Sequence, residues 1–153
     1  MTMNDVWINI EFKNYYSDSK KHGLKLFFDS SLTEEIICII KKYIAFLLKQ
    51  YFFPIRCNLF FSKEPTINNN GKNRDVFLGG ISKKYPTIYI VIRKKGRNMI
   101  PVLRKLTKLL TNYFQWYFYF DKSREAKINN REANLFARYL VGEFLLFKDD
   151  YDD

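Results

Sequence analysis

The sequence contains a single histidine, His22, and this scarcity removes most of the chemistry that depends on imidazole. A catalytic zinc needs about three protein ligands with lone pairs and a carboxylate that accepts a proton from bound water. His22 lies in a polar stretch, and we expect neither a Ser–His–Asp nor a Cys–His arrangement around it. No GxxxxGK[ST] or GxGxxG segment occurs, so no phosphate-binding loop is indicated. We therefore expect no catalytic residues, no metal and no cofactor.

Cysteines and long apolar runs are also scarce. Cys38 and Cys57 lack metal-ligand spacing and are interpreted as buried, reduced thiols. No run reaches the ~18 apolar residues of a membrane helix, because Lys41 and Lys42 interrupt the most apolar one. The N-terminal MTMNDVW lacks the pattern of a signal peptide. We expect a cytoplasmic protein that does not enter a membrane.

Acidic side chains are missing from residues 76–120, although the chain ends in an acidic tail at 148–153 and carries a formal net charge of +10. This segment favours an anionic partner, which could be nucleic acid, the acidic surface of a protein or an anionic membrane face. A solvated basic surface encoded by an AT-rich gene gives the same pattern, and composition does not separate these alternatives. The basic residues of the segment are Lys83, Lys84, Arg93, Lys94, Lys95, Arg97, Arg104, Lys105 and Lys108.

The chain does contain enough apolar material for one core. Its 153 residues are 47% hydrophobic and 18% aromatic. A domain of this size buries about 70% of its unfolded surface. We assign residues 1–147 to a single domain, in which residues 1–29 are a β-hairpin extension, and residues 148–153 to an acidic tail. The sequence does not determine the oligomeric state.

Alternation of apolar and polar residues predicts the strands. Residues 6–12 alternate and residues 24–28 are apolar except for Lys25, which predicts a hairpin with a polar turn over 14–23. Gly79 and Gly80 indicate either a bulge or a sheet edge to which an extended peptide could add a strand. Further strands are predicted at 55–62, 76–81 and 87–93, with a loop at 63–75.

Capping and helical periodicity predict three helices. Ser31 and Glu34 have the spacing of a capping box before the apolar run 36–53, and Pro54 ends that helix. Asn129 or Asn130 would cap the last helix. Its expected apolar face consists of Ala133, Phe136, Ala137, Leu140, Val141, Phe144 and Leu145.

The middle helix, residues 99–120, is the element on which the functional interpretation depends. Asn98 is its expected N-cap and Pro101 suits its first turn. The aromatic run 113–120 is expected to face the core or a partner, and a stacking platform for nucleic-acid bases is the alternative. The expected apolar stripe is Leu103, Leu106, Leu110, Tyr113, Phe114 and Tyr117, and the opposite polar face is Arg104, Lys108, Thr111, Asn112 and Gln115.

Two segments resemble zincin-like metallopeptidases of the ImmA/IrrE-type and minimal-zincin families. Residues 108–116 read KLLTNYFQW, where the family has a segment close to HExxHYFQW, and residues 132–137 read EANLFA, where it has E-A-N-x-F-A. The resemblance covers about residues 31–147. It implies an α+β fold in which the N-terminal β-hairpin is followed by α-β-β-β-α-α, with a small mixed sheet packed on helices.

The departures from the family pattern affect the residues that would hold zinc. Lys108 stands at the first histidine, Leu109 at the general-base glutamate and Asn112 at the second histidine. Only Glu132 retains a ligand type, and the Lys108 ammonium could pair with it in place of the metal. The resemblance therefore implies a catalytically inactive module.

We accordingly expect a binding or inhibitory module that recognises the acidic surface of a protein partner through the former active-site cleft or the sheet edge. The alternative is a nucleic-acid-binding protein that uses the basic surface over residues 83–108. Small size and AT-rich composition are typical of phage and mobile-element proteins. The candidate contact residues are Gly79, Gly80, Arg97, Arg104, Lys108, Asn112, Gln115 and Glu132.

Overall fold

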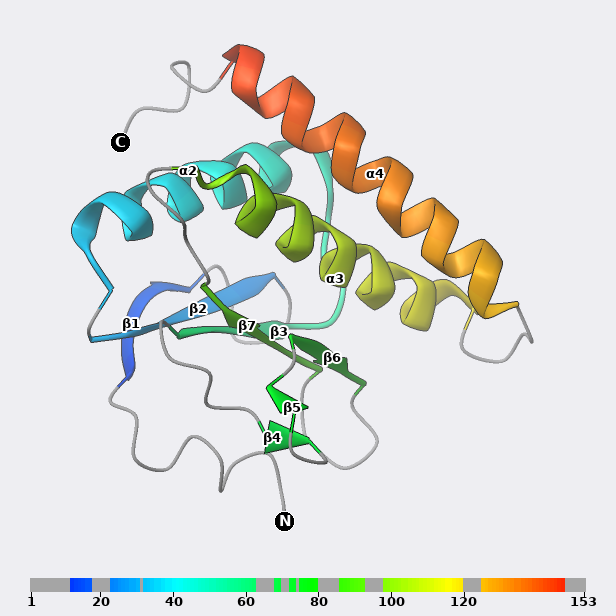
Figure 1. Ribbon diagram of the computed structural model, residues 1–153, viewed down its shortest axis with the longest axis horizontal. Helices are drawn as coiled ribbons and strands as arrows, with labels where there is room; N and C mark the ends of the chain where they lie inside the picture. Colours follow the sequence, from blue (N-terminus) through cyan, green and yellow to red (C-terminus); the bar gives the residue numbers. More distant parts are fainter. Residues whose placement is uncertain are drawn as a thin grey trace.

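The computed structural model describes residues 12–17, 23–30, 32–62, 68–69, 72–73, 75–79, 86–92, 98–119 and 125–147 (Figure 1). They form a mixed α/β fold. The strands are β1 (Phe12–Ser17), β2 (Leu24–Asp29), β3 (Cys57–Ser62), β4 (Asn68–Asn69), β5 (Lys72–Asn73), β6 (Val76–Leu78) and β7 (Thr87–Val91). The helices are α2 (Glu34–Gln50), α3 (Ile100–Tyr119) and α4 (Ala126–Phe147).

The main sheet has five strands in the order β1-β2-β3-β7-β6. Its central strands β2, β3 and β7 are parallel, and the edge strands β1 and β6 are antiparallel to their neighbours. Helices α2 and α3 lie on one face of this sheet, and α4 crosses them on the side away from it (Figure 1). The predicted mixed sheet packed on helices is therefore confirmed, and the order of elements roughly matches the predicted one.

Residues that alternate along the parallel strands build the core beneath the helices. Leu26, Leu59 and Ile88 are in register on adjacent strands, and all three are buried. On the opposite face, the rings of Phe27 and Phe60 stack with centroids 4.5 Å apart. The side chains of these three strands thus follow the period of two that the sequence indicated.

The N-terminal hairpin forms, but its first strand lies later in the chain than predicted. Residues 14–17, predicted as a turn, belong to β1, which pairs with β2. An irregularity between Asn14 and Tyr16 shifts the register, and such a bulge breaks the alternation by which a strand is recognised. Most of the predicted strand at 6–12 lies outside the described residues.

Helix α2 starts later and ends earlier than predicted. Thr33, not Ser31, is the N-cap, and its Oγ1 accepts a hydrogen bond from Ile36 N at 3.4 Å. The helix ends at Gln50 rather than at Pro54, because its C-cap, Tyr51, is extended and the residues after it lead to β3. Gly23, at a φ of 82°, donates its N–H to the Phe53 carbonyl oxygen at 2.8 Å. A left-handed conformation of this kind suits glycine.

The predicted loop 63–75 and the strands around it need smaller corrections. Strands β4 and β5 pair with each other inside that loop. Both β6 and β7 are shorter than predicted, and Gly79 follows the end of β6. Asp75 connects three elements, because its Oδ1 accepts a hydrogen bond from Val91 N at 2.6 Å and its Oδ2 lies 2.7 Å from Lys105 Nζ on α3.

Helix α3 has the predicted bounds, whereas α4 begins earlier than predicted. Asn98 caps α3, since its Oδ1 accepts a hydrogen bond from Ile100 N at 3.0 Å. Asn129 and Asn130 lie inside α4 rather than at its cap, because the Glu125 carbonyl already accepts from Ile128 N at 3.0 Å. None of the helices in the described ranges carries an apolar stretch that could cross a bilayer.

Exposure corrects the predicted faces of both long helices. Thr111 and Gln115, assigned to the polar outer face of α3, are buried. They lie on the side that α4 covers. Conversely Tyr117, Phe136 and Leu145, assigned to the core, are exposed. Both cysteines are free, as expected, but only Cys57 is buried, and this burial raises the pKa of its thiol; Cys38 is half-buried.

Candidate functional site

Three of the predicted contact residues meet between α3 and α4. The Gln115 Nε2 donates a hydrogen bond to Glu132 Oε1 at 3.0 Å and another to the Asn129 carbonyl oxygen at 2.8 Å. Its Oε1 accepts from Asn112 Nδ2 at 2.9 Å. Because the Gln115 amide is buried and bonded at both its ends, Asn112, Gln115 and Glu132 form one polar network that ties the two helices together.

The predicted pairing of Lys108 with Glu132 is not part of this network. Lys108 lies seven residues before Gln115 on α3. The pairing of Lys108 with Glu132 therefore stays a prediction. Arg104 is exposed and Lys108 is half-buried on the same helix.

The positions that correspond to zinc ligands have little metal-binding chemistry around them. Leu109 is buried in the core cluster. Within the described ranges, no group of three or more His, Cys, Asp or Glu side chains is close enough to hold a metal ion. The chemistry available between α3 and α4 is therefore hydrogen bonding and apolar contact.

Gly79 lies against α3, at the end of the edge strand. A Cβ atom built on Gly79 would be 2.8 Å from Trp116 Nε1, which is closer than real Cβ atoms approach. The close packing of the indole thus accounts for this glycine. The Trp116 Nε1 atom is buried and finds no hydrogen-bond partner among the described residues. The other predicted contacts, Gly80, Lys83, Lys84, Arg93, Lys94, Lys95 and Arg97, lie outside the described residues.

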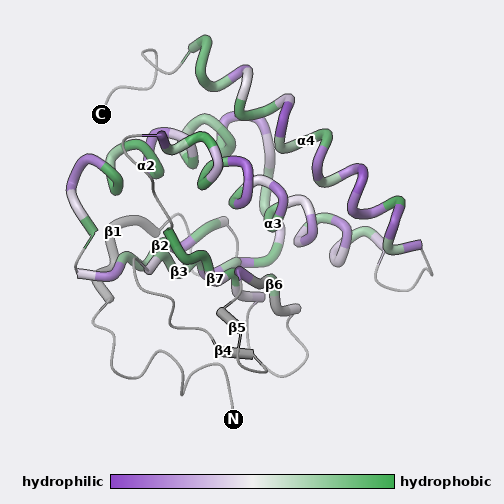
Figure 2. Tube along the Cα trace, in the orientation of Figure 1, coloured by the Kyte–Doolittle hydropathy of each residue, from purple (hydrophilic) through white to green (hydrophobic). Residues whose placement is uncertain are grey.

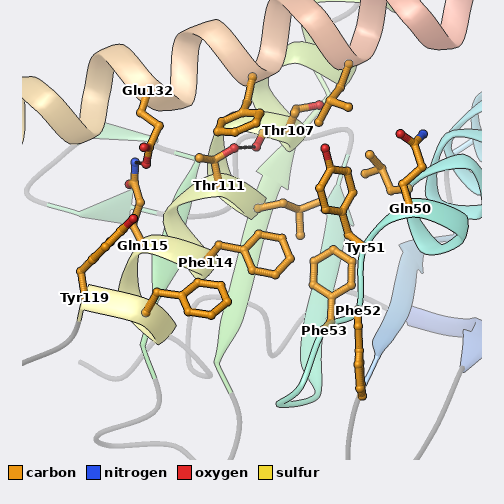
Figure 3. Close-up of a pocket in the computed structure, with 15 residues that line it drawn as sticks. Gln50, Tyr51, Phe52, Phe53, Thr107, Thr111, Phe114, Gln115, Tyr119 and Glu132 are labelled. Atoms are coloured by element: carbon orange, nitrogen blue, oxygen red, sulfur yellow. Dashed lines mark hydrogen bonds between the residues drawn. The ribbon is translucent and has the colours of Figure 1, made fainter.

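A cavity of about 430 Å³ opens between the C-terminal end of α2, the middle of α3 and the first half of α4 (Figure 3). Gln115 and Glu132 lie at one end of it, so it adjoins the polar network. Most of its wall is formed by five phenylalanine rings and three leucine side chains: Phe52, Phe53, Phe114, Phe118, Phe136, Leu47, Leu110 and Leu140. We call this cavity the aromatic pocket.

The polar side chains of the aromatic pocket already have partners within the chain. Thr107 Oγ1 donates to the Leu103 carbonyl oxygen at 2.7 Å and also forms a hydrogen bond with the Tyr43 hydroxyl. Thr111 Oγ1 donates to the Thr107 carbonyl oxygen at 2.8 Å. Since these hydroxyls are bonded internally, the surface that the pocket offers to another molecule is mainly apolar.

Three large side chains at the aromatic pocket are exposed to solvent. The exposed fractions are 59% for Phe52, 62% for Phe118 and 41% for Phe136. Scattered exposed apolar residues are ordinary, but a cluster around a concavity marks a binding surface. The sequence does not indicate this surface, because its apolar periodicity predicts Phe52 inside a helix and Phe136 in the core. The run of aromatics at 113–120, expected to face the core or a partner, was the one available signal.

Buried phenols beside the aromatic pocket make the free energy of unfolding depend on pH in the alkaline range. Burial raises the pKa of Tyr43 and Tyr113 above the ordinary value of 10.0, while hydrogen bonds to Thr107 and Ile55 respectively act in the opposite direction. A phenol whose pKa is higher in the folded state contributes stability that is complete below pH ~10 and is lost as the pH rises further. The pKa of Tyr51, which lines the aromatic pocket, is also raised. Burial is the larger cause and the charge of Glu143 the smaller one.

We therefore expect the free energy of unfolding to fall steadily above pH ~10. Urea unfolding measured at increasing pH, together with phenolate absorbance, tests this. The Tyr43→Phe variant should be less stable at neutral pH, because the buried hydrogen bond between Tyr43 and Thr107 is lost, and should show a shallower decline at alkaline pH. An unchanged slope in that variant would contradict the assignment.

Comparison of the chain with protein-family models, with curated proteins and with solved structures gave no match. The functional assignment therefore rests on the residues and geometry of the chain itself.

Proposed function

We propose that this chain is a catalytically inactive, zincin-like binding module whose aromatic pocket receives an apolar side chain of a protein partner. The observation that carries the proposal is the cluster of exposed Phe52, Phe118 and Phe136 around a cavity of about 430 Å³. Buried aromatic anchors in such pockets commonly supply 2–4 kcal/mol each, roughly, to protein–protein binding. The Gln115–Glu132 network at the end of the pocket would fix the helix positions and so keep it preformed.

The arrangement around α3 supports the zincin-like part of the proposal. Helix α3 follows the parallel strand β7 in the chain. The edge strand β6 pairs with β7 in the antiparallel direction. Phe77 of β6 contacts Trp116 of α3, with ring centroids 6.0 Å apart. Glu132, which the resemblance aligns with the third ligand, lies on the following helix and accepts a hydrogen bond from Gln115 of α3.

The zincin-like assignment can be tested by returning histidines to α3. We expect the double variant Lys108→His, Asn112→His to bind zinc at least tenfold more tightly than the unaltered chain, because two imidazoles one turn apart would join the Glu132 carboxylate. Competition with a chromogenic chelator measures the affinity. The variant Lys108→Ala, Asn112→Ala is the control. A folded double-histidine variant with no gain in zinc affinity would contradict the resemblance.

Nucleic-acid binding is the second candidate, favoured by the basic segment 83–108. Arg104 and Lys108, the described candidate contacts in it, lie on α3 outside the aromatic pocket. The two functions differ in salt dependence, because each phosphate that a protein neutralises releases counterions. An apolar contact has no such dependence.

The test begins with selection of binding peptides from a random phage-displayed library on the immobilised chain. We expect the selected peptides to share an aromatic or large aliphatic residue. The affinity of these peptides should change less than about threefold between low and high salt. The affinity of a complex held by several phosphate contacts would fall about 10³-fold over the same range. A random single-stranded DNA oligonucleotide is the comparison probe. DNA binding that is tighter than peptide binding and falls steeply with salt would favour the second candidate.

A further inference from the structure

Helix α4 carries a second apolar stripe that none of the described residues covers. Its inner face, which includes Ala133, Leu140 and Phe144, is buried against α2 and α3. On the opposite side, Leu135, Tyr139 and Leu146 have exposed fractions of 59%, 65% and 79%. Apolar and polar segments alternate along α4, which lies at the outside of the molecule (Figures 1 and 2).

The spacing of the outer stripe is that of a coiled-coil seam. The outer stripe also includes Glu132 and Gly142, which fill the gaps between its apolar residues. Its successive members are then four, three, four, three and four positions apart: Ile128, Glu132, Leu135, Tyr139, Gly142 and Leu146. A regular alternation of three and four gives a repeat of 3.5, which keeps one narrow stripe facing a neighbouring helix. We call these six residues the α4 seam.

Gly142 indicates that something approaches the α4 seam closely. A glycine inside a helix costs about 1 kcal/mol relative to alanine. Among the described residues none accounts for it, because no atom lies within 4 Å of where its Cβ would be. Glycine in such a position allows the backbone of another helix to come near. Gly142 thus leaves room at the α4 seam for a neighbouring helix.

The charges beside the α4 seam indicate which partner fits. Arg138 precedes Tyr139 on one flank, and Glu143 follows Gly142 on the other. Two parallel copies of a seam bring opposite flanks together, so that each Arg138 would face Glu143 of the second copy. An antiparallel pair brings like flanks together and would place arginines near arginines.

We propose that two copies of this chain associate in parallel through the α4 seam. Tyr139 and Leu146 pack against their counterparts, the two Gly142 residues allow close approach, and two Arg138–Glu143 pairs set the orientation. This proposal goes beyond the partner-binding function and does not depend on it, because Glu132 is the only residue of the seam that lines the aromatic pocket. The Glu132 carboxylate accepts its hydrogen bond from Gln115 of the same protomer.

Sedimentation equilibrium of the full chain over a hundredfold range of concentration tests the proposal. We expect a monomer–dimer equilibrium. Leu146→Glu should raise the dissociation constant at least tenfold, which is about 1.4 kcal/mol. The matched control is Phe147→Glu, one residue further along α4, exposed to 51% but off the seam; it should change the constant less than about threefold. Because both side chains are exposed, both variants should keep the circular dichroism of the folded chain.

Charge reversal tests the orientation. Arg138→Glu and Glu143→Arg should each weaken the dimer, and the double variant should restore it. An unaltered chain that is monomeric at every concentration, or equal effects of Leu146→Glu and Phe147→Glu, would overturn the proposal. So would a monomer that instead floats with phosphatidylserine vesicles, since the stripe would then be a membrane-facing surface. A double variant that does not recover would overturn the parallel pairing.

Discussion

Replacement of Phe144 by alanine is expected to lower the free energy of unfolding by about 3–5 kcal/mol, the range for deletion of a fully buried phenylalanine. Phe144 is completely buried, and its ring lies 5.1 Å from that of Tyr43 and 5.5 Å from that of Phe46, centroid to centroid. It is thus the main aromatic contact by which α4 is anchored to α2. Collapse of the surrounding side chains into the space would bring the value to the lower end of the range.

Urea unfolding followed by circular dichroism measures this effect. Phe147→Ala is the matched control, because Phe147 is exposed on the same helix and its removal should change the free energy of unfolding by no more than about 0.5 kcal/mol. Phe144→Ala should also weaken peptide binding, since α4 carries the Glu132 and Phe136 side chains of the aromatic pocket. A cost below about 1 kcal/mol would mean that α4 is not anchored as described.

Substitution of Phe118 by aspartate is expected to weaken binding of a selected peptide about 100-fold or more, equivalent to at least 2.7 kcal/mol. Phe118 stacks on Phe114, with ring centroids 6.2 Å apart, and still exposes most of its surface at the aromatic pocket. A carboxylate in its place would have to lose water on binding without gaining a partner. The chain itself should remain stable because the side chain is already exposed.

Isothermal titration of the peptide against Phe118→Asp and Phe147→Asp separates the pocket from a general effect of added charge. Both variants exchange an exposed phenylalanine for the same carboxylate, and only Phe118 lines the aromatic pocket. Equal losses in the two variants would contradict the assignment of the pocket as the binding site.

The parts of the fold that could be predicted are those whose side-chain pattern is local. Strands β2 and β3 and helix α3 were found near their expected positions, because apolar alternation, helical periodicity and the Asn98 cap are all encoded within a few residues. The end of α2 could not be found in this way. The segment that follows it is held by the hydrogen bond from Gly23 N to the Phe53 carbonyl oxygen, which joins residues thirty positions apart.

The candidate site shows the same division. The family resemblance identified Asn112, Gln115 and Glu132, and the structure brings them together in one network. Helical periodicity assigned Gln115 to an outer face, whereas α4 buries it, because a single period cannot indicate that two faces of a helix are covered. The aromatic pocket could not be predicted, since its rim comes from three elements whose relative positions only the tertiary structure defines.

The most direct test of partner binding through the aromatic pocket is amide chemical-shift mapping of a selected peptide on isotope-labelled protein. The account predicts that the largest shifts cluster at residues 50–53, 107–119 and 132–140, where the three walls of the pocket lie. Shifts confined to the edge strand and the basic segment 83–97, with the pocket amides unchanged, would contradict it.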